Sequence, residues 1–385
     1  MNNRPVRVLY YIDRLDSGGG AQKFILENIE HINNDKIHID CLSLDDGNVF
    51  KDVEDNLCKK NVSLFKLKGI WRIGLIGFIK YIFALNKFFK DHNDYDIIHM
   101  HGTSKEFFIL YFAKKYNIAV RIVHSHNIDF TTSSCIKKFI GNALKYPLRF
   151  YATDYFACSQ SAGKWLFGDE KTKDDKFHII NNAIDVDKFT FDDKIRKSIR
   201  TDMGLNDNFI IGHVGRFSKQ KNHDFLLEIF NEIYKTNSTA ILLLIGIGDD
   251  EKKIKEKAHT MKLDECVYFL GFKNNINEYM QAMDVFLFPS KFEGLGIVLI
   301  EAQAAGLPSF TAKEVVPQEA KVTDLLKYIS LDESSRVWAD AVLNISNDRT
   351  IDRKNEIEKA GYSIEQTANK LEKLYADMAR RKKCI

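Results

Sequence analysis

A group of basic residues follows a glycine in the second half of the chain. Arg216, Lys219 and Lys221 come shortly after Gly215, where an apolar run ends and a helix is expected to begin. A guanidinium binds phosphate oxygens through paired hydrogen bonds, an ammonium supplies a point charge, and the free N–H groups at a helix start attract anions. These residue types in this order predict a diphosphate site, and the alternative is a solvated basic turn.

Two glutamates lie farther along, in the stretch SKFEGLGIVLIEAQAAGLP at 290–308. On one continuous helix, Glu293 and Glu301 would lie roughly 80° apart and more than about two turns distant. The preceding DVFLFP reads as the end of a strand, so we expect Glu293 in a turn and a helix from about Ile297 to near Gly306. The two carboxylates would then hold different ends of one ligand.

Two histidine pairs raise the alternative of a metal site. His99 with His101, and His124 with His126, each place two imidazoles on one face of an expected strand. No cysteine or carboxylate set completes a zinc site around them. We therefore favour hydrogen bonding at the strand end for His99 and His101, and we expect no bound metal.

The elements that must position these residues follow one plan twice. Residues 6–32 and 209–234 each read as an apolar strand, a glycine-bearing turn and a helix with one apolar face. Strands and helices continue to alternate after each, which is typical of parallel sheets covered on both faces. We predict an α/β fold of two doubly wound domains, with ligands at the carboxyl ends of the strands near the glycine turns.

The domain boundary is expected in the polar segment 189–208, between a first domain at 1–190 and a second at 205–362. A last helix at 363–385 has no strand after it, so it either caps the second domain or crosses back to the first. Neither glycine turn has the dinucleotide pattern G-x-G-x-x-G, and the chain has no P-loop motif, so a nicotinamide or P-loop enzyme is not indicated.

Composition limits the class of protein. The chain has 385 residues, enough for about two domains, and 45% hydrophobic and 12% aromatic residues favour packed globular domains. A net charge of +3 gives no reason to expect nucleic acid as a partner. Six cysteines without a C-x-x-C pair predict reduced, mostly buried thiols in a cytosolic protein, and the N-terminus reads as a short strand rather than a signal peptide.

Basic and apolar residues are mixed in two runs of the first half. Residues 59–90 contain eight basic residues and no acidic one, and residues 133–153 add Lys137, Lys138, Lys145 and Arg149, again without an acid. Such helices suit an anionic bilayer surface and a lipid pyrophosphate. The alternative is that their apolar residues belong to the core. Lys80 interrupts the longest apolar run, so we expect peripheral binding and no membrane span.

Seven features of the sequence occur in an order that is specific as a set. They are G-G-A-Q at 19–22, D-I-I-H-M-H-G at 96–102, V-H-S-H-N at 123–127, C-S-Q-S-A-G-K-W-L-F-G at 158–168, N-N-A-I-D-V-D-K-F at 181–189, G-R-F-S-K-Q-K-N-H at 215–223 and the glutamate pair. Over essentially its whole length the chain resembles the family 4 glycosyltransferases of the GT-B architecture, and within them bacterial exopolysaccharide and capsule enzymes. The resemblance implies two Rossmann-like domains facing a central cleft, with the last helix returning to the first domain.

The resemblance also implies roles for the residues of the second domain. Arg216 and Lys221 match the pair that neutralises the diphosphate of a nucleotide-sugar donor. Glu301 matches the glutamate that binds the ribose hydroxyls, and Glu293 matches the one at the donor sugar. The backbone amides beside the sugar and phosphates would be those of Gly294, Leu295, Gly296 and Ile297.

In the first domain, the resemblance implies an acceptor site. His124 matches a strand-end histidine beside the transferred sugar, and Gly19 and Gly20 match a loop that closes over the diphosphate. Two departures stand out: Gln22 replaces a glutamate of the family, and Ala183 replaces a glycine. If the turn at Ala183 needed a positive φ, alanine would be strained there.

The implied activity is retaining, metal-independent transfer of a sugar, with UDP as the expected nucleotide and no cofactor, to a lipid-linked saccharide in exopolysaccharide, capsule or O-antigen synthesis. Expected partners are the donor, that acceptor and the inner face of the cytoplasmic membrane. Two Asp-x-Asp runs, at 94–96 and 185–187, have the letters of a metal motif of GT-A enzymes, but one leads into a strand and the other lies in the 181–189 turn. A nucleotide-sugar epimerase and a non-catalytic scaffold remain alternatives, as do attack from the leaving-group face and double displacement.

Overall fold

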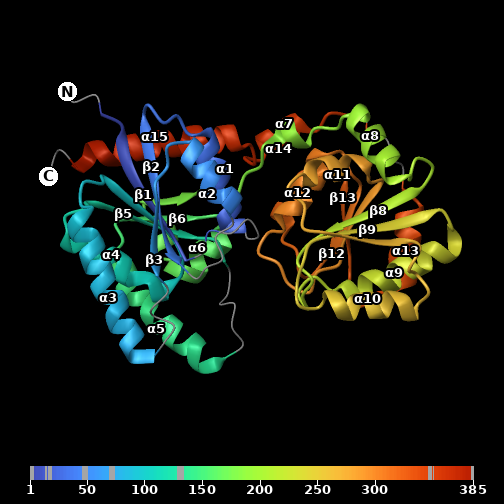
Figure 1. The fold of residues 1–385 in the computed structure, drawn as a ribbon, viewed down its shortest axis with the longest axis horizontal. Helices are drawn as coiled ribbons and strands as arrows, with labels where there is room; N and C mark the ends of the chain where they lie inside the picture. Colours follow the sequence, from blue (N-terminus) through green and yellow to red (C-terminus); the bar gives the residue numbers. More distant parts are fainter. Residues whose placement is uncertain are drawn as a thin grey trace. The chain divides into compact units, whose positions relative to one another are not determined.

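The computed structural model describes residues 4–13, 15, 20–45, 51–68, 74–127, 134–345, 349 and 351–382. The chain forms two compact units. Unit 1 comprises Met1–Ala183 with Ile364–Ile385, and unit 2 comprises Ile184–Ser363. Each unit is a twisted sheet covered by helices (Figure 1). The two-domain α/β architecture predicted from the alternation of strands and helices is confirmed.

Unit 1 is built on a seven-stranded sheet with the order β3-β2-β1-β4-β5-β6-β7, in which all neighbouring strands are parallel. The strands are β1 (Val6–Ile12), β2 (Ile37–Asp45), β3 (Leu64–Lys68), β4 (Ile97–His101), β5 (Val120–Ser125), β6 (Asp154–Ala157) and β7 (Phe177–Ile179). The helices are α1 (Gly20–His31), α2 (Lys51–Lys59), α3 (Gly74–Asp91), α4 (Phe107–Lys115), α5 (Cys135–Tyr151), α6 (Gln160–Phe167) and α15 (Ile364–Lys382).

The central strand of unit 1 is buried on both faces. Val8 and Tyr10 of β1 belong to a core shared with α1, α2 and α15, whereas Leu9 and Tyr11 belong to a core shared with α3, α4, α5 and α6. A strand covered on both faces reads as a continuous apolar run, which is the pattern of VRVLYYI. The two cores therefore account for the lack of polar alternation in this strand.

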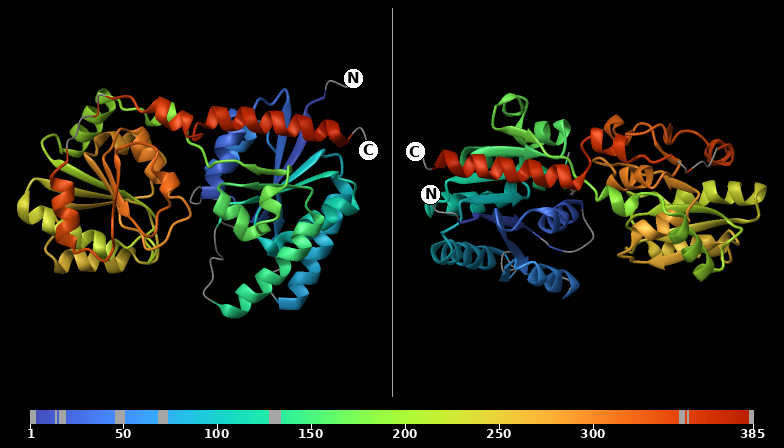
Figure 2. Two further views of the ribbon diagram at one scale, coloured as in Figure 1. Left: turned by 180° about the vertical axis from the view of Figure 1, so that it is seen from behind. Right: turned by 90° about the horizontal axis from the view of Figure 1, so that it is seen from above.

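Helix α15 packs on unit 1. Its residues Ala368, Leu371, Tyr375 and Met378 recur at helical spacing and lie in the same core as β1. Figure 2 shows α15 running across unit 1 beside α1. The last helix of the chain thus completes the first unit, because it covers apolar strand residues that would otherwise face water.

Unit 2 is built on a six-stranded parallel sheet with the order β10-β9-β8-β11-β12-β13. The strands are β8 (Phe209–Val214), β9 (Ala240–Ile245), β10 (Val267–Gly271), β11 (Val285–Phe288), β12 (Ser309–Ala312) and β13 (Leu326–Ile329). The helices are α7 (Val186–Phe189), α8 (Asp193–Met203), α9 (His223–Thr236), α10 (Glu251–Thr260), α11 (Ile276–Ala282), α12 (Ile297–Ala304), α13 (Ser335–Leu343) and α14 (Lys354–Lys359).

The boundary predicted at 189–208 lies inside unit 2, which begins at Ile184. The reason is a buried acid: the Asp284 carboxylate accepts hydrogen bonds from Arg196 at 2.5 Å and Arg200 at 2.6 Å, both from α8. A carboxylate buried this deeply needs such partners, so the polar segment is bound to the core of unit 2 rather than forming a linker. Ile184 also pairs with Ser363, which brings the two ends of unit 2 together.

None of the helices in the described part of the chain is long and apolar enough to cross a membrane. The five cysteines within the described residues are free thiols. Only two of them, Cys41 and Cys266, are buried, so the expectation of mostly buried thiols is wrong for this part of the chain.

Candidate functional site

Each sheet has one point where the winding of the chain reverses. In unit 2 it lies between β8 and β11, and in unit 1 between β1 and β4. Loops that leave the carboxyl ends of such neighbouring strands run apart and leave room for a ligand. The residues after β8, β11, β1 and β4 are therefore the first place to look for a site.

The turn after β8 packs backbone against backbone. The N–H of Gly215 donates to the carbonyl of Ile245, and the N–H of Phe217 donates to the carbonyl of Ile247. A Cβ on Gly246, whose φ is +143°, would lie 2.1 Å from the Gly215 oxygen. Only glycine fits at this position, so Gly246 lets the turn after β9 pack against the turn after β8.

Lys221 and Glu293 form the central pair of unit 2. The Lys221 ammonium lies 2.5 Å from the Glu293 carboxylate, and the two side chains are 16% and 7% exposed. The ammonium also lies 4.5 Å from the centre of the Phe288 ring. The two turns are joined by the Lys291 N–H, which donates to the Gln220 carbonyl at 2.8 Å. The sequence assigned these residues to different parts of a ligand, and the structure brings them into direct contact.

Helix α12 begins at Ile297 and ends at Ala304, as predicted. Its N-cap residue Gly296 has φ +76°, and a Cβ there would lie 3.3 Å from Leu299 and 3.4 Å from Phe288. Glycine is therefore required where the chain turns from the Glu293 loop into the helix. Glu301 lies on this buried helix and is only 3% exposed.

Arg216 differs from Lys221 in its surroundings. Its side chain is exposed, and it forms no ion pair within the described residues. Two histidines lie behind Lys221: burial, with the Lys221 charge adding to it, lowers the pKa of His223 to about 4. Burial likewise lowers the pKa of His213 well below its ordinary value. Both rings are neutral at pH 7, so neither adds positive charge beside Arg216 and Lys221.

The histidines of unit 1 gather at the carboxyl ends of β4 and β5. His101 and His124 are register partners, and the rings of His124 and His126 stack with centroids 4.1 Å apart. His124 is 0% exposed, whereas His126, just past the end of β5, is partly exposed. The predicted contact of His124 with a sugar stays a prediction, and His126 has the more exposed ring of the two.

Sequence reasoning paired His126 with His124 because both point to one face of the strand, and the resemblance assigned the sugar contact to His124. The signal that separates them is position: Ser125 is the last residue of β5, and functional side chains in parallel sheets follow the strand end. The Phe24 ring of α1 lies near both rings, 4.9 Å from that of His124 and 5.3 Å from that of His126, so position relative to the strand end is what distinguishes them.

The glycine loop after β1 is described only in part. Gly18 and Gly19 lie outside the described residues, and Gly20 is the first residue of α1. A Cβ on Gly20 would lie 3.8 Å from the Asn182 amide nitrogen, so this helix start and the 181–189 turn are neighbours. Ala183 is buried and is absent from the residues with positive φ, so its replacement of glycine carries no backbone strain.

Three buried histidines are close enough to bind a metal. The ligating nitrogens of His99, His101 and His124 all lie within 4.8 Å of one another. A second group of Glu27, Glu30 and His31 lies on α1. The first group contains no acidic residue, and the second contains no residue of β4 or β5. Among the described residues, none from the turns after β8 and β11 belongs to either group.

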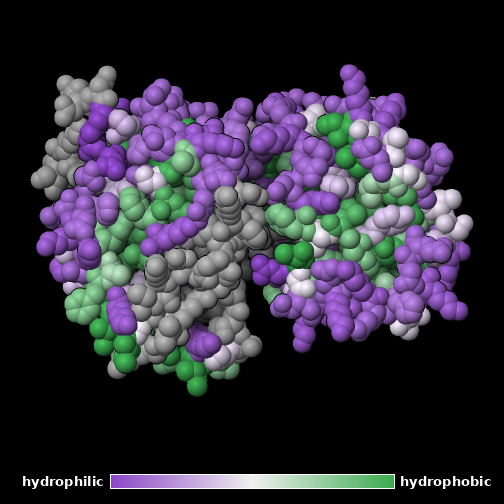
Figure 3. All heavy atoms as spheres, in the orientation of Figure 1, coloured by the Kyte–Doolittle hydropathy of each residue, from purple (hydrophilic) through white to green (hydrophobic). Residues whose placement is uncertain are grey.

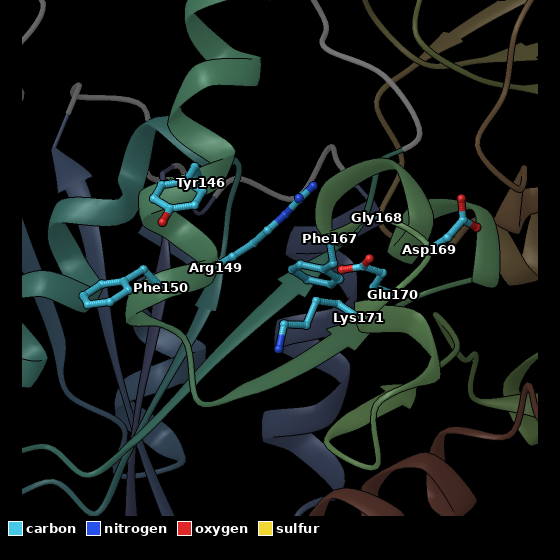
Figure 4. A pocket seen from close by; sticks show the side chains of 8 residues that line it. All are labelled: Tyr146, Arg149, Phe150, Phe167, Gly168, Asp169, Glu170 and Lys171. Carbon is cyan, nitrogen blue, oxygen red and sulfur yellow. The ribbon is translucent and has the colours of Figure 1, made fainter.

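The pocket in Figure 4 has a volume of about 460 Å³ and lies between α5 and the end of α6. Arg149 donates to the Leu166 carbonyl at 3.0 Å on one side of it. Its charged residues carry both signs, with Arg149 and Lys171 beside Asp169 and Glu170. Because this end of α5 leads into the start of β6, the pocket lies at the amino ends of the strands, away from the histidines.

Exposed apolar side chains gather on α3 and α5. Five of them are at least 70% exposed: Ile76, Phe83, Ile136, Phe139 and Tyr146. Figure 3 shows hydrophobic atoms at the free ends of these two helices. Lys145 does not belong to this surface, because its ammonium donates to the Trp165 carbonyl at 2.7 Å and lies over the Trp165 ring. The basic run of α5 thus has one surface cation fewer than the sequence suggested.

Two family models match the chain. The model described as Glycosyltransferase Family 4 matches residues 18–188. The model described as Glycosyl transferases group 1 matches residues 195–364. The two matches fall on different halves of the chain, so each sheet with its helices carries a match of its own.

Similar proteins extend over nearly the whole length. EpsF of Bacillus subtilis (strain 168), a provisionally named glycosyltransferase, is 28% identical over 380 residues, which are 97% of each chain. The Escherichia coli UDP-Gal:alpha-D-GlcNAc-diphosphoundecaprenol alpha-1,3-galactosyltransferase is 27% identical, with 93% of this chain and 94% of the relative covered. The crystal structure of Anabaena HepE in complex with UDP and glucose aligns with a TM-score of 0.69 at 17% identity over 98% of both chains, a likeness of fold.

Proposed function

Since the chain belongs to the family 4 glycosyltransferases, we propose that it transfers a sugar, with retention, from a UDP-sugar to a lipid-linked saccharide in exopolysaccharide, capsule or O-antigen synthesis. The Escherichia coli relative is named for a diphosphoundecaprenol acceptor, and the Anabaena structure contains UDP. These names support the classes of donor and acceptor. The particular sugar is left open.

The observation that carries the proposal is the arrangement at the β8–β11 switch point. Arg216 and Lys221 follow β8, and Glu293 follows the neighbouring strand β11 and contacts Lys221. The first turn of α12 starts in the same loop. Two cations and a helix start suit a diphosphate, and a carboxylate beside them suits sugar hydroxyls.

Breaking the bond between sugar and phosphate places negative charge on the departing diphosphate. Fixed cations and helix N–H groups that already surround this charge lower the barrier. In the proposed site Arg216 and Lys221 stabilise the leaving group, and Glu293 orients the sugar. Glu301 binds the ribose, with the backbone of 294–297 between them. Because the cations belong to side chains, we expect no metal or other cofactor to be needed.

The direct test is a donor panel. Purified protein is incubated with UDP-, GDP- and ADP-sugars, with and without a lipid-diphosphate saccharide, in the presence of a chelator. We expect one UDP-sugar to be consumed and an extended lipid product to form with the anomeric configuration of the donor. A changed nucleotide sugar without any acceptor would instead identify an epimerase, and binding without consumption a scaffold.

The two cations give a sharper prediction. Arg216→Ala and Lys221→Ala should each lower turnover at saturating donor by about two to three orders of magnitude, because each removes one stabilising partner of the leaving group. Lys197→Ala is the control, since this lysine of α8 is 76% exposed and α8 leads into the amino end of β8, the end opposite to the site. Unchanged turnover in either site variant, with an unchanged melting curve, would contradict the assignment.

We also propose that the protein binds peripherally to the cytoplasmic face of the membrane through α3 and α5. The exposed apolar residues of these helices are accompanied by Lys80, Lys137 and Lys138. Helix α5 contains no acidic residue. Apolar side chains that enter the bilayer interface, with cations beside them, bind anionic lipid. Such binding would hold the enzyme where a lipid-linked acceptor is available.

A further inference from the structure

The side chains of four histidines and two tyrosines in unit 1 form two hydrogen-bonded runs. The histidines lie at or just past the carboxyl ends of β4 and β5. In the first run the Tyr10 and Tyr375 hydroxyls lie 2.8 Å apart, and the Tyr375 hydroxyl lies 2.6 Å from Nδ1 of His99. Nε2 of His99 then lies 3.2 Å from Nδ1 of His124. This run is fully buried and ends inside the core.

The second run reaches the surface. Nδ1 of His101 lies 2.9 Å from Nε2 of His126, and Nδ1 of His126 lies 3.2 Å from the amide oxygen of Asn182. His101 and His99 stack with centroids 4.2 Å apart, so the first run supports the second from behind. His126 thus has a partner at each ring nitrogen.

All four rings are neutral at pH 7. Burial lowers the pKa of His99, His101 and His124 well below the ordinary value, and lowers the pKa of His126 to about 4. A neutral imidazole has one N–H and one lone pair, so each ring in a run donates at one nitrogen and accepts at the other. Once the position of the proton is known at one end of a run, it is fixed at every ring of that run.

The buried His101 end sets the direction of the second run, because the Asn182 amide can either accept through its oxygen or donate through its nitrogen. With the amide oxygen as the acceptor, Nδ1 of His126 carries the proton and Nε2 accepts from Nδ1–H of His101. Nε2 of His101, which is buried and has no hydrogen-bond partner within the described residues, is then a lone pair. If the amide were turned to donate, every proton would reverse and this atom would become a buried N–H without a partner, which proteins avoid more strictly than an unpaired acceptor.

We propose that His101 and Asn182 are positioning residues that hold His126 in the tautomer with its proton on Nδ1. His126 then offers a ligand one hydrogen bond, donated from Nδ1 to a saccharide or phosphate oxygen in exchange for Asn182. It does not act as a base, because its only lone pair is bound by His101. This role toward a ligand rests on the proposed function, whereas the tautomer does not.

A divalent metal between His99, His101 and His124 is the competing use of this cluster. A metal would need the lone pair of His99 or His124 that their shared hydrogen bond occupies. It would also place two positive charges beside the Phe24 and Phe156 rings, 4.9 Å and 5.9 Å from the His124 ring. A buried charge without an opposite charge is costly, so the geometry favours the neutral runs.

The first test reads the tautomers without any substrate. Long-range proton–nitrogen spectra of the full chain, labelled at histidine and assigned with single histidine variants, should show at pH 7 a protonated Nδ1 and an unprotonated Nε2 for His126 and for His101. His101→Phe should abolish the preference at His126, because it removes the buried ring that fixes the direction of the run, and Tyr155→Phe, a buried hydroxyl loss on the other face of the sheet, should leave it unchanged. A protonated Nε2 or a charged ring at His126, or a stoichiometric metal in elemental analysis, would overturn the proposal.

The second test uses transfer activity. The amide nitrogen of asparagine replaces Nδ1 of histidine, and that of glutamine replaces Nε2. His126→Asn should therefore retain about three- to tenfold more of kcat than His126→Gln, the range expected for one net hydrogen bond. Equal loss in both, or better activity of His126→Gln, would refute the donor role even if the tautomer is as expected. If no donor is ever consumed, the proposed function fails and the spectra still decide the tautomer.

Discussion

Lys221 has one observed partner and one proposed partner. The sequence assigns its ammonium to a diphosphate, and the structure pairs it with the Glu293 carboxylate at 2.5 Å. An anionic ligand would thus compete with Glu293 for the same cation. The pair also places an opposite charge beside a lysine that is only 16% exposed, as a largely buried charge requires.

This pairing leads to a prediction about the two glutamates. Glu301→Gln should weaken UDP binding roughly 10- to 100-fold, because it removes a charged acceptor of the ribose hydroxyls. Glu293→Gln should leave UDP affinity unchanged or slightly higher, since Lys221 is released for the diphosphate, but should lower kcat about 10-fold or more. Calorimetry with UDP and turnover at saturating donor measure the two effects. Loss of UDP affinity alone in both variants would show that the division between ribose and sugar is wrong.

At the scale of elements, α5 combines two roles along its length. Leu148 packs in the core of unit 1, whereas Phe139 and Ile136 near its start are 75% and 73% exposed. Exposed aromatic and aliphatic side chains at one helix start add nothing to the core. Their conspicuous exposure is explained if the helix inserts into a bilayer surface.

A single substitution in α5 of the full chain therefore tests whether this helix binds the membrane. Phe139→Asp should reduce sedimentation with phosphatidylglycerol vesicles by about tenfold or more, because an apolar side chain no longer enters the interface and an opposing charge is added. Val337→Asp is the matched control, since this α13 residue of unit 2 is also exposed, at 42%. Added salt should weaken binding of the unaltered protein, as expected for surface charges. An equal loss in both variants, or no binding before substitution, would contradict the assignment of α5.

For the whole molecule, buried imidazoles set the response to acid. Burial lowers the pKa of His99, His101 and His124 in unit 1 and of His213 in unit 2, and lowers the pKa of His126 and His223 to about 4. In the unfolded chain these groups titrate near 6.5. Above that pH neither state binds the protons, and below it only the unfolded state does, so stability falls as pH falls from about 6.5 toward 4.

We expect the urea midpoint to be constant from pH 8 to 7 and to fall steadily between pH 6.5 and 4.5. Carboxylates with a lowered pKa, such as Asp40 and Asp224, lose their contribution only below this window, as pH falls past their unfolded value of 3.8. Far-ultraviolet dichroism in urea at several pH values measures the midpoint. A midpoint that stays level or rises on going from pH 7 to 5.5 would show that the rings are not held neutral.

The sequence by itself predicts the two-unit architecture, which is confirmed, and the chemistry of the proposed donor site, which stays a prediction. Two strand–glycine–helix starts and continuous apolar strands are local patterns, and they predict two doubly wound units. The start of α12 at Ile297 also follows from local signals, namely the end of DVFLFP and the glycines after Glu293. These features depend on neighbours in sequence, which is why they can be read there.

Only the tertiary structure decides which groups meet across long separations. Asp284 binds Arg196 and Arg200 and thereby draws the supposed linker into unit 2. Glu293 reaches back to Lys221, and Tyr375 of the last helix reaches His99. His124 and His126 are the same residue type on the same strand face, yet the first ring is buried within β5 and the second, past the strand end, is partly exposed. Pairing and burial depend on which elements become neighbours in space, and spacing along the chain does not contain that information.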